Sequence, residues 1–189
     1  MTMATDPLLP APEWQTSVWL NTPQPLSLAA LRGRVVLLHA FQMLCPGCVS
    51  HALPQAQRVA ASFADAPLVV IGLHTVFEHH AVMGPDALRA FVHEYRIRYP
   101  VAVDAPGPNG DPLPLTMRAY DMQGTPTLVL IDALGRLRHQ AFGAVDDLAL
   151  GALIGQLLAE AQRVDAEPTG AAVGDLPGCD DERCRPAAG

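Results

Sequence analysis

The stretch VVLLHAFQMLCPGC, residues 35–48, decides the fold. Its first half, residues 35–41, is apolar and partly β-branched, which is typical of a central strand that is covered on both faces. A Cys-Pro-Gly-Cys run follows at once, and residues 49–63 then carry apolar side chains at helical spacing. The pattern predicts a buried strand that leads through Cys45 and Cys48 into a helix.

The two cysteines of this junction are placed for thiol chemistry. Cys45 would lie at the start of the helix, with Pro46 in the first turn, where a missing amide hydrogen costs little. Unpaired backbone amides and the helix dipole favour a thiolate on Cys45, and the thiolate is the nucleophile in disulfide exchange. Cys48 would lie one turn further on, close enough to attack a mixed disulfide. A Cys-x-x-Cys motif beside a βαβ pattern predicts a redox function.

The rest of the chain alternates between strand and helix patterns. Residues 17–20 and 26–28 flank the turn 21–23 and predict an N-terminal β-hairpin. Residues 105–114 hold four prolines and two glycines, which predicts a loop. The other expected elements are strands at 68–73, 127–131 and 136–142, a short extended piece at 99–103, and helices at 85–98 and 145–164.

This order predicts an α/β fold with a central mixed sheet and helices on both faces. The last two strands are expected to form an antiparallel edge of that sheet. We expect a flexible N-terminal segment at 1–13, one domain at 14–164, and a flexible C-terminal tail at 165–189 that carries a second cysteine pair.

Three motifs together resemble the thioredoxin-like superfamily, and most of all its TlpA-like and AhpC/TSA-type redoxin branch. They are the strand that leads into the Cys45–Cys48 run, Pro54 inside the following helix, and Gly124-Thr125-Pro126-Thr127 ahead of a strand. The resemblance implies a thioredoxin fold in which the Thr125–Pro126 bond is cis and faces the cysteines. It also implies that Thr125 and Pro126, with Pro46 and Gly47, contact the substrate.

Three positions depart from the family pattern. His39 stands where thioredoxins have a buried aspartate, Leu44 replaces the usual tryptophan, and His51 stands where many TlpA-like proteins have a glutamate. His39 or His51 could handle the proton of the resolving thiol, because imidazole titrates near neutral pH. The alternatives are a core histidine satisfied by a backbone carbonyl at position 39, and simple partial exposure at position 51.

Composition excludes several other functions. A net charge of −7 argues against a nucleic-acid role, and all 12 basic residues are arginine, which excludes a lysine Schiff base. No apolar run approaches the ~18 residues of a membrane span. The first residues, 1–13, have neither the basic start nor the apolar core of a secretory signal, so we expect a cytoplasmic location.

The predicted function is thiol–disulfide exchange with a disulfide-containing protein or small molecule, supported by a separate thiol reductant. We expect a monomer. We also expect no organic cofactor, because no phosphate-binding glycine loop is present. One alternative is a thiol-dependent peroxidase, although the motif Pro-x-x-x-Thr-x-x-Cys is absent before both Cys45 and Cys48. Another is a redox-inactive or metal-binding interaction module, but no ligand spacing supports a metal site. Cys179 and Cys184 could form a local disulfide, relay electrons to Cys45, or belong to an incidental tail. Metal binding is a further alternative, although two thiols are too few for a closed zinc site.

Overall fold

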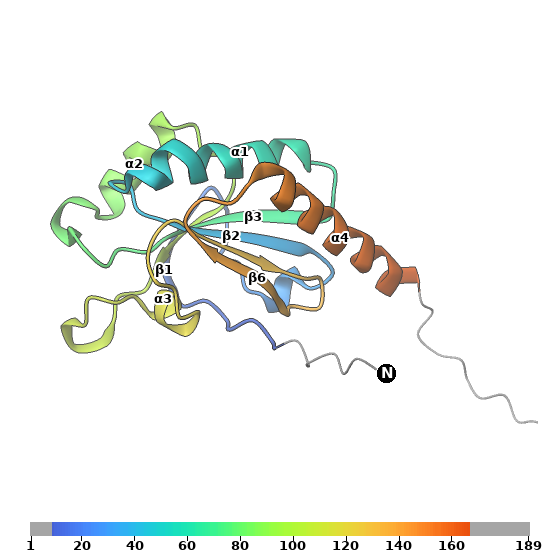
Figure 1. Ribbon diagram of the computed structural model, residues 1–189. Coiled ribbons are helices and arrows are strands. Elements are labelled where there is room, and N and C mark those ends of the chain that lie inside the picture. The colour runs from blue at the N-terminus through green and yellow to red at the C-terminus, as the bar shows by residue number, and fades with distance from the viewer. Residues whose placement is uncertain (1–8, 167–189) are drawn as a thin grey trace, which may run out of the picture.

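The structure, a computed structural model, describes residues 9–166, and it shows one six-stranded sheet with helices against both faces (Figure 1). The strands are β1 (Thr16–Leu20), β2 (Val35–Phe41), β3 (Leu68–His74), β4 (Val101–Asp104), β5 (Thr127–Ile131) and β6 (Leu137–Phe142). The helices are α1 (Leu53–Ser62), α2 (Pro85–Glu94), α3 (Leu115–Ala119) and α4 (Asp147–Ala166). The expected α/β architecture is confirmed.

The sheet is mixed, and its strand order is β1-β4-β3-β2-β5-β6. β3 pairs in parallel with both β2 and β4, whereas β5 runs antiparallel to β2 and β6. All seven residues of β2 are buried, because this strand lies inside the sheet with packed layers on either side. The strand that the sequence marks as central therefore has a central position.

The side chains of β2 point alternately into two hydrophobic cores, one on each face of the sheet. Val35 and Leu37 pack with residues from α1, α2 and α4 on one face of the sheet. Val36 and Leu38 pack on the other face with α3 and with Trp14 from the N-terminal segment. Each side chain follows the strand period of two, so a continuous apolar run can supply both faces. The result is a three-layer molecule in which β2 is fixed from both sides.

The expected N-terminal β-hairpin is wrong. β1 pairs antiparallel with β4 at the edge of the sheet, and residues 26–28 form no strand. Pro23 and Pro25 cannot donate to a ladder, because proline has no backbone N–H. The backbone N–H of Leu28 instead donates to the Glu13 carboxylate at 2.9 Å, which holds this segment against the sheet without strand pairing.

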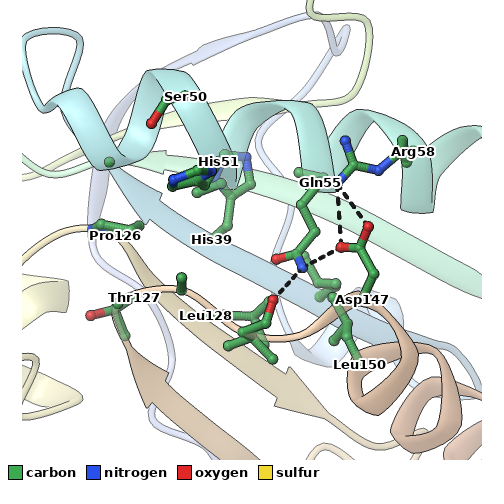
Figure 2. A pocket seen from close by; sticks show the side chains of 17 residues that line it. His39, Ser50, His51, Gln55, Arg58, Pro126, Thr127, Leu128, Asp147 and Leu150 are labelled. Carbon is green, nitrogen blue, oxygen red and sulfur yellow. Dashed lines mark hydrogen bonds and ion pairs between the residues drawn. The ribbon is translucent and has the colours of Figure 1, made fainter.

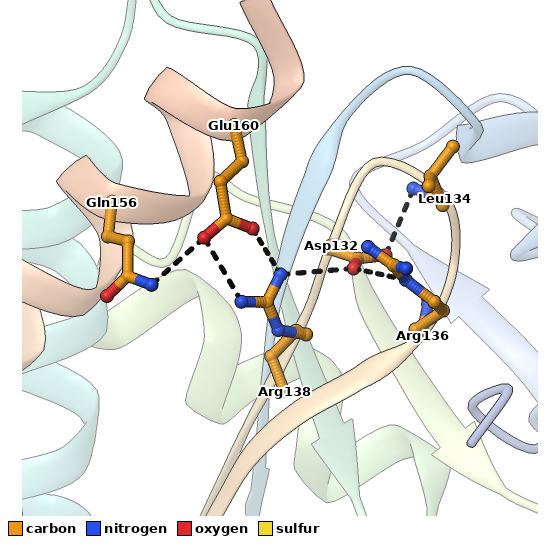
Figure 3. Close-up of polar contacts among 6 residues, drawn as sticks. All are labelled: Asp132, Leu134, Arg136, Arg138, Gln156 and Glu160. Carbon is orange, nitrogen blue, oxygen red and sulfur yellow. Dashed lines mark hydrogen bonds and ion pairs between the residues drawn. The ribbon is translucent and has the colours of Figure 1, made fainter. Parts of the chain in front are cut away.

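Two features outside the site fix the far end of the sheet. Arg138 on β6 joins Asp132, in the β5–β6 turn, to Glu160 on α4 (Figure 3). The described chain begins beside the same turn, where the backbone N–H of Leu137 donates to the carbonyl of Leu9 at 3.0 Å. α4 is thereby tied to the sheet at the end opposite the Thr125–Pro126 loop.

Candidate active site

Cys45 and Cys48 lie at the junction between β2 and the helical segment that follows it. The backbone N–H of Cys45 donates to the Gln42 carbonyl at 3.3 Å, and Val49 N–H donates to the Cys45 carbonyl at 3.1 Å. The backbone N–H of Cys48 points at Cys45 Sγ, 3.3 Å away. An N–H donor in this position stabilises negative charge on the sulfur. The structure therefore brings the two predicted cysteines together and gives Cys45 a thiolate-stabilising contact.

The first turn after the cysteines is wider than an α-helical turn. Residues Cys48–Ala52 form a π-helix, in which the N–H of Leu53 reaches back to the Cys48 carbonyl. Pro54 explains the widening, because it has no N–H to donate to the Ser50 carbonyl one α-helical turn earlier. Regular α1 begins only at Leu53. The proline that the sequence marks inside the helix thus reshapes the turn that carries Cys48.

The two thiols have different surroundings. Cys45 is half-buried, whereas Cys48 is completely buried in the core that α1 forms with the sheet. Burial, reinforced by the hydrogen bond with Cys45, raises the pKa of the Cys48 thiol to about 12. Cys48 therefore holds its proton at neutral pH, and Cys45 is the sulfur that an external disulfide can reach.

The Thr125–Pro126 loop closes the other side of the site. The Thr125–Pro126 peptide bond is cis, as the resemblance implied, and the Cys45 thiol lies 3.4 Å from the Thr125 carbonyl oxygen. Gly47 faces the same loop so closely that a Cβ on it would lie 3.4 Å from Pro126 Cδ. Loop and cysteine turn are therefore in contact, and Thr125, Pro126 and Gly47 lie beside the reactive sulfur. Pro46 occupies the turn itself, where its carbonyl accepts a hydrogen bond from the Ser50 hydroxyl at 2.8 Å.

The two histidines of the predicted site differ in accessibility. His39 is buried in β2, and its Nε2 lies 2.9 Å from the Tyr99 hydroxyl, so its partner is a side chain rather than the expected backbone carbonyl. Burial lowers the pKa of His39 to about 3, which keeps the ring neutral at physiological pH. His51 is exposed at the start of the helical segment. Neither imidazole makes a hydrogen bond to a cysteine among the contacts of the described residues.

A cavity of about 420 Å³ extends from the cysteine turn along α1. Figure 2 shows His39, His51 and Pro126 on its walls near the site, with Gln55 and the Arg58–Asp147 ion pair further along. The Gln55 side-chain amide crosses to the Val145 carbonyl at 2.8 Å and to Asp147 at 2.7 Å. The sequence did not reveal this wall, because β6 and α4 bring residues 143–150 to α1 from a distant part of the chain.

The remaining expectations concern the C-terminal cysteine pair, a metal site and a membrane span. Cys179 and Cys184 fall outside residues 9–166. Within the described range, no group of three or more His, Cys, Asp or Glu side chains is placed to hold a metal ion. No helix between residues 9 and 166 has the length and apolar character of a membrane span.

The mixed sheet and the paired cysteines are those of a thioredoxin-like protein, and two solved structures support this class. A crystal structure of a thioredoxin-like superfamily protein is 55% identical, with a TM-score of 0.77, and the match covers 79% of this chain and 96% of that one. A thiol-disulfide isomerase from Corynebacterium glutamicum is 49% identical, with a TM-score of 0.75, over 81% of this chain and 96% of that one. The protein is therefore thioredoxin-like.

The family model for the AhpC/TSA family matches residues 9–140, so the chain belongs to the AhpC/TSA family. Protein DipZ of Mycobacterium tuberculosis is 34% identical over 146 residues, which cover 76% of this chain. The matched region is 20% of DipZ, so the chain spans about a fifth of the length of this curated relative. These likenesses support a redox function in general terms.

Proposed function

We propose that the protein is a thiol–disulfide oxidoreductase that exchanges the Cys45–Cys48 dithiol with the disulfide of a partner protein or small molecule. The observation that carries this proposal is the asymmetry of the two sulfurs. Cys45 is half-buried and receives the Cys48 N–H at 3.3 Å, whereas Cys48 is fully buried directly behind it. One sulfur is thus set to attack and the other to resolve.

The reaction takes two displacement steps. The Cys45 thiolate attacks a substrate disulfide, forms a mixed disulfide, and releases the first substrate thiol after protonation. Cys48 then loses its proton and attacks Cys45 Sγ, which releases the second substrate thiol and leaves a Cys45–Cys48 disulfide. Two electrons pass from the protein to the substrate. In a reducing cytoplasm, where the sequence predicts the chain to work, a separate thiol reductant would restore the dithiol.

The second step needs a base, because the pKa of Cys48 is raised to about 12 by burial. His39 is poorly suited to this, since burial lowers its pKa to about 3 and the proton transfer would be steeply uphill. His51 is exposed on the helical segment that carries Cys48, and it lines the cavity along α1. We assign proton removal to His51, and a structural role inside the sheet to His39, which bonds the Tyr99 hydroxyl.

Insulin reduction and partner trapping with two serine variants test the exchange mechanism. Cys45→Ser should abolish the reduction of insulin by dithiothreitol above the uncatalysed rate, because the attacking sulfur is gone. Cys48→Ser should stop at the first step and accumulate a mixed disulfide that mass spectrometry detects as an adduct of one insulin chain. Circular dichroism shows whether both variants keep the fold. Full catalysis by folded Cys45→Ser would refute the proposal.

Peroxide reduction is the second candidate function, and the AhpC/TSA family match favours testing it. In that reaction the Cys45 thiolate would attack a peroxide oxygen, and Cys48 would condense with the resulting sulfenic acid. Peroxide consumption with dithiothreitol as reductant separates the two activities. We expect a rate close to that of dithiothreitol alone, because the threonine of the peroxide-binding motif is missing before Cys45.

A further inference from the structure

A groove at the end of α2, called here the α2 groove, gathers positive side chains on one concave surface. It holds about 640 Å³, and its walls come from the end of β1 and from the stretch that leads from α2 toward β4. Arg89, His93, Arg96 and Arg98 line it, and Glu94 is the one acidic residue that the structure places on its wall. Like charges on a concave surface focus the electrostatic potential, so the groove attracts an anionic group.

Arg96 and Arg98 have no ion-pair partner in the described part of the chain. Arg89 pairs with Asp86 at 2.6 Å. Arg96 and Arg98 are exposed, and neither makes an ion pair with any residue from 9 to 166. The chain has 19 acidic and 12 basic residues, so a groove in which arginines outnumber carboxylates is opposite in sign to the whole protein.

The acidic counterpart in the sequence is a stretch near the C-terminus. Residues 175–182 hold four carboxylates and no basic residue, and Asp180-Asp181-Glu182 is the longest run of acidic residues in the chain. These residues lie beyond the described part of the chain, which ends at residue 166. Their charge is complementary to that of the α2 groove.

The described chain ends at the same end of the sheet as the groove. β2, β3 and β4 run parallel, so residues 96–98, which precede β4, lie at the end where β2 begins. α4 is tied to this end through Glu160, which pairs with Arg138, and its last residue is Ala166. Asp180 lies 14 residues beyond Ala166, so the connecting chain can span up to ~46 Å, whereas six strands are only ~24 Å across. The acidic run can therefore reach the groove.

We propose that residues 175–182 bind in the α2 groove, where the carboxylates of Asp180 and Asp181 pair with Arg96 and Arg98. Exposed ion pairs are individually weak. Attachment to the same chain compensates for this, because it gives the acidic run an effective concentration in the ~mM range.

This binding has a consequence for the second cysteine pair. Cys179 and Cys184 flank the run at 180–182, so both would be held at the end of the sheet where β2 begins. Cys45 follows the other end of β2, whose seven residues extend over ~23 Å. The second pair would then be kept away from Cys45 and would not relay electrons to it.

Paramagnetic relaxation in the full-length protein tests the proposal. A nitroxide is attached to Cys179 after the other three cysteines are changed to serine, and it weakens the amide signals of residues that it approaches. The amide signals of residues 93–98 should weaken relative to the same sample after reduction with ascorbate. At about 1 M NaCl this weakening should be lost, because the Debye length falls to ~3 Å. The amide spectrum also shows whether the labelled protein keeps its fold.

Two pairs of arginines provide the variant and its control. Arg96→Gln/Arg98→Gln should abolish the weakening, because it removes the partners of the carboxylates. Arg32→Gln/Arg34→Gln should retain it, since both of these arginines are exposed but do not line the groove. The labelled protein lacks the active-site thiols, so the result does not depend on the exchange reaction.

Charge exchange tests the same contact in the opposite sense. Arg96→Asp/Arg98→Asp should abolish the weakening, and adding Asp180→Arg/Asp181→Arg should restore it with the signs reversed. The proposal is overturned if residues 93–98 are not weakened in the labelled protein, or if the two glutamine variants behave alike. Weakening centred on the amide of Thr125 would also overturn it, because the second cysteine pair would then lie at the active site.

Discussion

His39 is a neutral imidazole in the middle of the sheet, and this protonation state links the site to stability. Its pKa falls from 6.5 in an unfolded chain to about 3 in the folded protein, because burial disfavours the charged form. Between these two values the unfolded chain binds a proton that the folded protein excludes. Acid therefore favours unfolding, and the contribution of His39 to stability is lost as the pH falls from about 6.5 to about 3.

The double variant His39→Leu/Tyr99→Phe tests this linkage. It removes both partners of the buried hydrogen bond, so neither is left unsatisfied. Between pH 7 and pH 5.5 the wild type should lose about 1 kcal/mol more free energy of unfolding than the double variant, as measured by urea denaturation. His74, whose pKa burial also lowers, to about 4, is present in both proteins and cancels in this difference.

Equal pH dependence in the wild type and the double variant would mean that the folded protein protonates His39 as readily as the unfolded chain does, contrary to its burial.

The sequence predicts the residues of the site as far as local pattern reaches. Cys45, Cys48 and Pro126 follow from short motifs, and the structure brings them together. The hydroxyl that partners His39 does not follow, because Tyr99 lies 60 residues away and reaches His39 only through the pairing of β2, β3 and β4. The sequence can predict that a buried polar atom needs a hydrogen-bond partner, but it does not predict which distant side chain provides that partner.

At the scale of elements, the backbone at Cys48–Ala52 forms a π-helical turn in place of an α-helical one. Pro54→Ala would restore an N–H that can donate to the Ser50 carbonyl and let the turn tighten into an α-helix. We expect about 1 kcal/mol of added stability in urea denaturation, because proline is unfavourable inside a helix. We also expect insulin reduction to slow about tenfold, because Cys48 would move relative to Cys45.

Pro85→Ala provides the comparison, because Pro85 begins α2, where no N–H is needed. That variant should leave the rate of insulin reduction unchanged. An unchanged rate in Pro54→Ala as well would show that the wide turn has no part in the reaction.

Elements with strong apolar patterns were predictable, and elements fixed by distant contacts were not. β5 has the bounds that its apolar run predicts. The helix α3 was missed because it is five residues long and depends on Asp104, whose carboxylate accepts the N–H groups of Thr116 and Met117 at 2.8 and 2.9 Å. The N-terminal hairpin was wrong for a related reason, since the partner of β1 is β4, far along the chain.

At the scale of the whole molecule, Arg138 connects the β5–β6 turn to α4 (Figure 3). Its guanidinium donates to Asp132, which is 4% exposed, and to Glu160, which is 27% exposed. Arg138→Ala should lower the free energy of unfolding by about 2 kcal/mol, because it leaves the buried Asp132 carboxylate with fewer donors. Glu160→Gln should cost about 1 kcal/mol or less, because its site is more open to water.

Urea denaturation of both variants measures this difference, and insulin reduction should remain at the wild-type rate because the network lies at the opposite end of the sheet. Equal losses of stability in the two variants would show that Arg138 does not stabilise the fold chiefly through Asp132.

The hydrogen bond from Leu137 to Leu9 has a consequence for how the domain can be joined to other parts of a polypeptide. It anchors the first described residues at the pole of the sheet remote from the sulfurs. α4 begins beside the cavity and, with 20 residues, carries the chain about 30 Å away from it. Both ends of the described chain therefore lie away from the Cys45–Cys48 site. A linker or a further domain fused at either end would leave this site open to a substrate disulfide.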